Sequence, residues 1–245
     1  MRFLILFLVS VPGTLAAQPL GTKVKGELSG NLFFGNTRQL LTTSRLGYEQ
    51  VDSAFQTRTE GRFNYGQTKN DSGVTEVSKR SWIVTGSGDL RPFAAVVPFV
   101  QAALESSLEK KIDRRYSAGT GARYNIVRSP ATDVILSVGV LGERTRVLNA
   151  PPGVDEVGVA RGLTTIRLRR EFSDRVSFTS ESGYQPVLRA LEQYTFNSDN
   201  SLQFKVSKRM SFTLSLRDSY DSEARSRGAR TNNDGELVVG VLTTN

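Results

Sequence analysis

The chain of 245 residues contains no cysteine and no histidine. Without cysteine it has no disulfide framework, no thiolate nucleophile and no iron–sulfur site. Without histidine it has no Ser-His-Asp triad, no imidazole base and no histidine-ligated zinc. These absences exclude the classes of enzyme and metal site that depend on histidine or cysteine, and we predict neither a cofactor nor a metal site.

Long hydrophobic runs are also scarce. The one clear run covers residues 3–11, between Arg2 and Pro12, and a small residue follows at Ala17. This pattern is typical of a secretory signal peptide, and the run is too short for a transmembrane helix, which needs about 20 residues. We therefore expect cleavage after Ala17 and an exported single domain over residues 18–245.

The chain also lacks a strong excess of charge of one sign. The chain has 32 Lys and Arg against 24 Asp and Glu, which gives a net charge of +8, and its hydrophobic content is 38%. Mixed charge together with 9% aromatic residues does not indicate disorder. A sequence pI near 9.9 would suit a nucleic-acid-binding protein. The basic residues do not cluster with aromatic residues, however, so we expect no nucleic-acid partner.

What the chain does contain, from residue 22 onward, is alternation with a period of two, which is typical of strands with unlike faces. Between Phe55 and Tyr65, for example, aromatic, threonine and glycine residues alternate with charged or amide residues. Each such segment has about the 9–11 residues with which a tilted strand crosses a bilayer. The predicted strands are 22–34, 40–51, 54–66, 79–91, 94–106, 114–127, 132–145, 160–172, 175–186, 193–206, 209–220 and 235–244.

The links between these strands alternate in length. Short turns are expected at 52–53, 91–93, 129–131, 173–174 and 207–208, and longer links at 35–39, 67–78, 107–113, 146–159, 187–192 and 221–234. Only helices and closed barrels satisfy every backbone polar group in hydrocarbon. The sequence therefore predicts an all-β, antiparallel up-and-down transmembrane barrel of about 12 strands in the bacterial outer membrane. Its short turns and both termini would lie in the periplasm and its longer loops outside.

One face of the predicted strands carries charges of both signs. In a dry core such groups would cost several kcal/mol each if unpaired, whereas a wet lumen or a lattice of salt bridges accommodates them. Leu163 shares this face, and Pro98 lies in mid-strand, where we expect a bulge. The candidate lumen-lining residues are Arg58, Glu60, Arg62, Arg123, Glu143, Arg167, Arg169, Glu171, Glu181 and Arg217.

Two stretches carry a resemblance to a known family: Gly35-Asn36-Thr37 after the first strand, and the strand YSAGTGARY at residues 116–124. With the overall strand pattern they make the chain similar to the family of uncharacterised salt-induced outer membrane proteins. The resemblance implies an outer-membrane barrel of unknown function with a response to salt, and it supplies no functional residues. The sequence ends in Val-Leu-Thr-Thr-Asn, without the terminal aromatic residue that the outer-membrane assembly machinery, an expected partner, commonly reads.

The arginines of the inner face suggest a narrow passive channel that favours small anionic solutes. On this hypothesis, changing Arg62 and Arg167 to glutamate should reverse the ion preference. The alternative is a closed lumen, in which the same arginines pair with Glu60, Glu105, Glu143, Glu171 and Glu181. Both interpretations stay open at the level of sequence.

Two further functions are compatible with parts of the sequence. An enzyme would need a Ser–Lys or paired-carboxylate scheme, since no histidine is present, and we expect none. An envelope interaction protein, with a closed lumen and a response to salt stress, would bind membrane lipids or the phosphates of lipopolysaccharide. The candidate outer-loop anion-binding residues are Arg225, Arg227 and Arg230, for which solvated loop charge is the alternative.

Overall fold

The computed structural model describes residues 21–33, 38–69, 75–150 and 156–244. The expected signal peptide lies outside these residues and stays a prediction, as does the domain boundary at residue 18. The strands are β1 Gly21–Phe33, β2 Arg38–Val51, β3 Phe55–Lys69, β4 Thr75–Leu90, β5 Val96–Ser107, β6 Ile112–Arg128, β7 Thr132–Val147, β8 Val157–Glu171, β9 Val176–Val187, β10 Ala190–Lys205, β11 Met210–Asp221 and β12 Asn233–Thr244.

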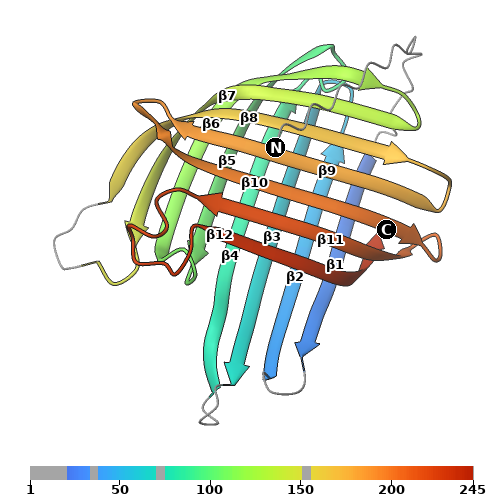
Figure 1. Cartoon of the computed structure of the whole chain (residues 1–245). Helices are drawn as coiled ribbons and strands as arrows, with labels where there is room; N and C mark the ends of the chain where they lie inside the picture. The colour runs from blue at the N-terminus through green and yellow to red at the C-terminus, as the bar shows by residue number, and fades with distance from the viewer. Residues whose placement is uncertain (1–20, 34–37, 70–74, 151–155, 245) are drawn as a thin grey trace, which may run out of the picture.

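The strands form one closed barrel in which every strand pairs antiparallel with its neighbours in sequence, and β1 pairs with β12. In Figure 1 the orange and red strands of one wall cross in front of the blue and green strands of the other, as in a barrel with strongly tilted strands. The seam between β1 and β12 is short, joining Lys25–Ser29 to Gly240–Thr244. The predicted all-β barrel of 12 antiparallel strands is confirmed.

Most strands run farther than the sequence pattern indicated, so several links are shorter than expected. The link predicted at 187–192 is a two-residue turn at Leu188 and Arg189. The two long links, 148–156 and 222–232, lie at the same end of the barrel. The opposite end holds the shorter turns, the start of β1 and the end of β12, and the barrel plan places it in the periplasm. We call the end with the long links the outer end.

The outward face of the barrel is apolar. Leu28 is 64% exposed, Leu216 54% and Leu237 59%. In a water-soluble monomer so continuous an apolar surface is rare, whereas a lipid-facing wall requires it. Among the described residues there is no helix of membrane-spanning length and hydropathy.

Aromatic side chains mark both edges of this wall. Near the outer end, Tyr184, Tyr194 and Tyr220 lie on three adjacent strands. The ring of Tyr194 is stacked on that of Tyr220, with centroids 5.2 Å apart, and is tilted against that of Tyr184, with centroids 5.4 Å apart. Near the periplasmic end, Tyr48 and Phe172 are exposed. Aromatic residues at both ends of the strands are typical of the two interfacial belts of a membrane barrel.

Leu163 does point inward, as its place in the alternation indicated. It is 4% exposed and packs with Phe99 and Leu141 in a small apolar cluster inside the barrel. The bulge expected at Pro98 is absent, because Pro98 pairs in register with Ala122. The ladder between β4 and β5 starts beside it, at Asp89 and Phe99, so the missing N–H costs no hydrogen bond with β4.

Close approach of β6 and β7 requires glycine at residue 139. A Cβ atom there would overlap the carbonyl oxygen of Thr120 and lie 3.0 Å from the Cα of Gly121. At Gly142 on the same strand, a Cβ atom would meet nothing within 4 Å. Gly139 is therefore a packing requirement and Gly142 is not.

We expect Gly139→Ala to lower the free energy of unfolding by roughly 1–3 kcal/mol, the cost of overpacking, because a backbone atom must move. Gly142→Ala should leave stability unchanged or slightly raised. Urea unfolding in detergent, followed by the emission of the single tryptophan, Trp82, measures both. Equal stability of the two variants would contradict the packing argument.

Candidate functional site

A layer of ion pairs crosses the middle of the lumen. Its members, here called the central cluster, are Glu27, Arg45, Glu60, Arg62, Asp199 and Arg217. The key contact joins Arg62 on β3 to Asp199 on β10 at 3.0 Å. Because β3 and β10 are five positions apart around the ring of twelve strands, this contact connects opposite walls.

Asp199 is the centre of that layer. Besides Arg62 it lies 3.4 Å from Arg217 and 3.9 Å from Arg45. Arg45 in turn bonds Glu60 at 2.7 Å, and Glu27 lies 3.7 Å from Arg217. Three arginines thus face three carboxylates, and the central cluster is neutral as a whole.

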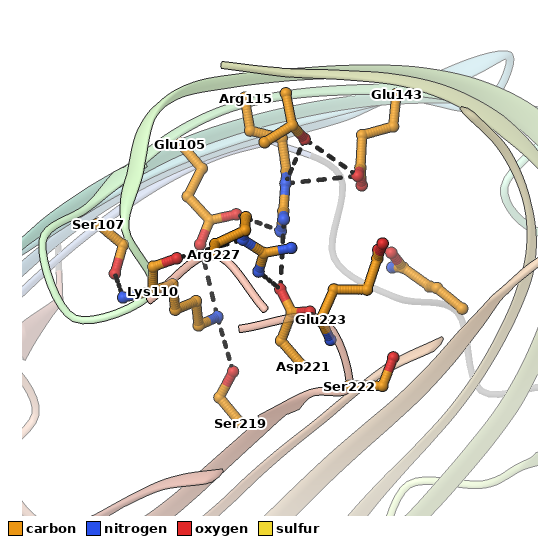
Figure 2. A network of polar contacts seen from close by, with 12 residues as sticks. Glu105, Ser107, Lys110, Arg115, Glu143, Ser219, Asp221, Ser222, Glu223 and Arg227 are labelled. Atoms are coloured by element: carbon orange, nitrogen blue, oxygen red, sulfur yellow. Dashed lines mark hydrogen bonds and ion pairs between the residues drawn. The ribbon is translucent and has the colours of Figure 1, made fainter. Parts of the chain in front are cut away.

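A second layer, the outer cluster, lies nearer the outer end, and Figure 2 labels most of its members. Its members are Glu105, Lys110, Arg115, Glu143, Arg161, Asp221, Glu223 and Arg227. Arg115 on β6 reaches Asp221 on β11 at 3.3 Å, again between strands five positions apart. Arg161, which is 1% exposed, binds Glu143 at 3.0 Å. Four basic groups meet four acidic ones, so this layer is also neutral.

The link 222–232 forms part of the outer cluster. Arg227 donates to Asp221 at 2.5 Å and to the carbonyl oxygen of Lys110 at 3.3 Å. Ala224 is 2% exposed, so the link packs into the barrel mouth rather than extending away from it. In Figure 1 this segment, in red, curls at the end of the barrel.

The periplasmic half of the lumen carries ion pairs mainly between neighbouring strands. Arg167 binds Glu181 at 2.9 Å, and Arg58 binds Glu49 at 2.9 Å. The guanidinium of Arg123 lies 4.5 Å above the ring of Phe99 and also contacts Asp89. Arg169 pairs with Glu171 at the rim.

Arg217 differs from the other lumen arginines. Its side chain is 8% exposed, and its two carboxylate neighbours lie at 3.4 and 3.7 Å. All three guanidinium nitrogens are buried and, among the described residues, none has a hydrogen-bond partner. A buried charged donor without an acceptor costs several kcal/mol, so the site favours an added acceptor such as a water molecule or an anion.

The structure places all ten lumen candidates on the inward face, where each of the six arginines among them has a carboxylate neighbour. The outer-loop candidates separate: Arg225 and Arg230 are exposed, whereas Arg227 is held by Asp221 and is not free for an external anion. Sequence reasoning missed Glu27, Arg45, Arg115, Arg161 and Asp221 as cluster members. Three of these, Arg115, Arg161 and Asp221, lie an even number of residues from a predicted lumen residue on the same strand, and this spacing indicates that they point inward.

A closed barrel with a lipid-facing outer wall and a charged interior defines the class of outer-membrane β-barrel proteins. Within that class, the chain belongs to the family described as protein of unknown function, DUF481, whose model matches residues 26–244. That description mentions neither a function nor salt, so the salt response stays a prediction. No sequence among the curated proteins matches the chain.

The chain also matches solved structures at low sequence identity. The chain is similar to the translocator domain of the autotransporter NalP from Neisseria meningitidis, with a TM-score of 0.49, 10% identity, and coverage of 94% of this chain and 90% of that one. It is also similar to an outer membrane channel from Pseudomonas putida F1, with a TM-score of 0.49, 10% identity, and coverage of 96% and 98%. For the KdgM porin the TM-score is 0.46, the identity 13%, and the coverage 91% and 97%.

Proposed function

We propose that the protein is a narrow outer-membrane channel for small anionic solutes, closed in this conformation by two layers of ion pairs. Its export would rest on the signal peptide expected at residues 1–17. The observation that carries the proposal is Arg217, a buried guanidinium in the layer that crosses the lumen, with no hydrogen-bond partner among the described residues. A carboxylate or phosphate passing through the layer would supply the missing acceptors.

The chemistry of the layers also supports a channel rather than a permanently filled core. Ion pairs between charged side chains exchange readily for contacts with water and mobile ions, whereas packed apolar side chains do not. The net charge of the two clusters does not favour anions, because each cluster is neutral. Anion preference would therefore come from Arg217, whose three guanidinium nitrogens lack acceptors among the described residues, whereas Arg62 lacks one at Nε.

The experiment is conductance of the refolded chain in a planar bilayer under a salt gradient. We expect a reversal potential on the anion side, which Arg217→Gln moves toward zero because the neutral amide no longer attracts anions. The matched control is Arg209→Gln, which removes the same charge from an exposed periplasmic turn. A shift of equal size in both variants would contradict the role of Arg217.

A second candidate is a closed envelope barrel that binds lipopolysaccharide or a protein partner. The two neutral layers and the inserted link 222–232 favour it. Folded protein without conductance in any salt gradient would favour this candidate over the channel.

A further inference from the structure

At the outer end of the barrel, the positive charges of the outward wall are unevenly distributed. Four exposed arginines, here called the outer basic patch, lie there: Arg80 on β4, Arg114 on β6, and Arg144 and Arg146 on β7. Arg114 and Arg146 are directly opposite each other in the ladder, and like charges in that position repel. Asp113 contacts both, at 3.4 and 3.8 Å. Arg80 and Arg144 make no side-chain hydrogen bond or ion pair within the described part of the chain.

The outer basic patch lies at the level of lipid headgroups. Arg80 is two residues beyond Trp82 toward the outer end, and Arg114 is two residues beyond Tyr116. Exposed aromatic side chains of this kind mark the boundary between hydrocarbon and water. An arginine just outside that boundary meets headgroup phosphates rather than acyl chains.

Beside the patch, the wall has a groove of about 210 Å³, whose lining includes Phe63, Arg80, Trp82, Ser106 and Leu148. The groove forms because the small Ser106 stands directly opposite the large Trp82 in the ladder, one residue before β5 ends. Its other walls are mostly apolar, and Arg80 stands at its edge. Such a groove suits an acyl chain whose headgroup lies on the arginines.

The opposite wall differs in charge. The outer ends of β9 to β11 carry Tyr184, Tyr194 and Tyr220, with Glu192 and Asp218 on those strands. Arg189, exposed in the turn between β9 and β10, is offset there by these two acids, so the outer ends of β4, β6 and β7 form the more positive of the two walls. This excess of positive charge complements a lipid with more than one phosphate.

We infer that the outer basic patch and its groove bind a phosphorylated, acylated glycolipid of the outer leaflet, of the lipid A type. Its phosphates contact Arg80 and Arg144, the two arginines without carboxylate partners, and an acyl chain occupies the groove between Phe63 and Trp82. The site is on the outside of the barrel and does not depend on whether the lumen conducts.

Trp82 is the single tryptophan and lines the groove, so its emission reports on binding directly. The refolded chain in detergent micelles is titrated with bisphosphorylated lipid A, with dephosphorylated lipid A and with inorganic phosphate. We expect a saturable change with lipid A and an apparent affinity about tenfold or more weaker for the dephosphorylated lipid, as the loss of charge-assisted hydrogen bonds implies. Inorganic phosphate should cause no change.

The variant Arg80→Gln/Arg144→Gln should weaken lipid A binding by a similar factor, while Arg80→Lys/Arg144→Lys keeps the charge and most of the affinity. The control Lys208→Gln/Arg209→Gln, on an exposed turn at the other end, should bind as the unmodified chain does. Equal affinity for both lipids would overturn the proposal. A response to inorganic phosphate alone would also overturn it. The same holds if Arg225→Gln/Arg230→Gln abolishes lipid A binding while Arg80→Gln/Arg144→Gln keeps it.

Discussion

Replacing Asp221 by alanine is expected to reduce the free energy of unfolding by roughly 3–5 kcal/mol, the cost of breaking a buried ion pair by removing one partner. The Asp221 side chain is 1% exposed and accepts hydrogen bonds from Arg115 and Arg227. It also accepts one from the backbone N–H of Glu223 at 3.0 Å. Its loss leaves two guanidinium groups in the barrel mouth without their carboxylate, and it releases the start of the link 222–232.

The matched control is Asp113→Ala, because Asp113 also contacts two arginines but is 41% exposed. Exposed pairs contribute little, so the control should unfold close to the unmodified chain. Urea denaturation in detergent, read from Trp82 emission and from the heat-dependent gel shift of a folded barrel, compares the two. Similar midpoints for both variants would show that the outer cluster does not hold the mouth together.

Removing Arg62 and Asp199 together should raise single-channel conductance severalfold. The double change to alanine deletes the 3.0 Å contact between opposite walls without leaving either member of that pair alone. The control is Arg167→Ala/Glu181→Ala, which deletes a pair of similar length between the adjacent strands β8 and β9. Since that pair does not cross the lumen, its removal should change conductance less.

Keeping both charges on different side chains, in Arg62→Lys/Asp199→Glu, should keep the lumen closed if the attraction across it is what closes it. Exchanging the charges would not test this, because Arg217 and Arg45 lie 3.4 and 3.9 Å from Asp199 and would repel an arginine there. High conductance in the charge-retaining variant would indicate that packing around residues 62 and 199, rather than their attraction, determines closure. No rise in the alanine double variant would assign closure to the outer cluster alone.

The alternation along each strand was sufficient to predict the barrel, because a period of two is local and each strand repeats it. The same parity assigned Arg62 and Arg217 to the inward face. The alternation did not predict which inward residues form ion pairs with each other. The pair of Arg62 with Asp199, for example, depends on which walls face each other across the closed ring. The position of a residue in the alternation predicts whether its side chain points into the lumen. It does not predict the distance to a side chain on the opposite wall.

The predicted ends of the strands also differ from those in the structure. Asp221 was expected at the start of a long loop, yet it is the last residue of β11. The long polar link predicted at 187–192 is a tight turn because β9 and β10 continue their ladder up to Val187 and Ala190. Polar composition identifies a link in sequence but does not separate a loop from a hairpin that extends beyond the membrane.

The short seam between β1 and β12 has a consequence for the order of assembly. Every other strand pair joins neighbours in sequence and can form as a local hairpin, whereas the seam joins Lys25–Ser29 to Gly240–Thr244, from opposite ends of the chain. Bringing such distant segments together carries the largest loop-closure entropy, so the seam is expected to form last. Glu27 lies in the seam and contributes to the central cluster. The network across the lumen is therefore completed only when the ring closes, and the buried charges of a partly folded chain stay incompletely compensated until that final step.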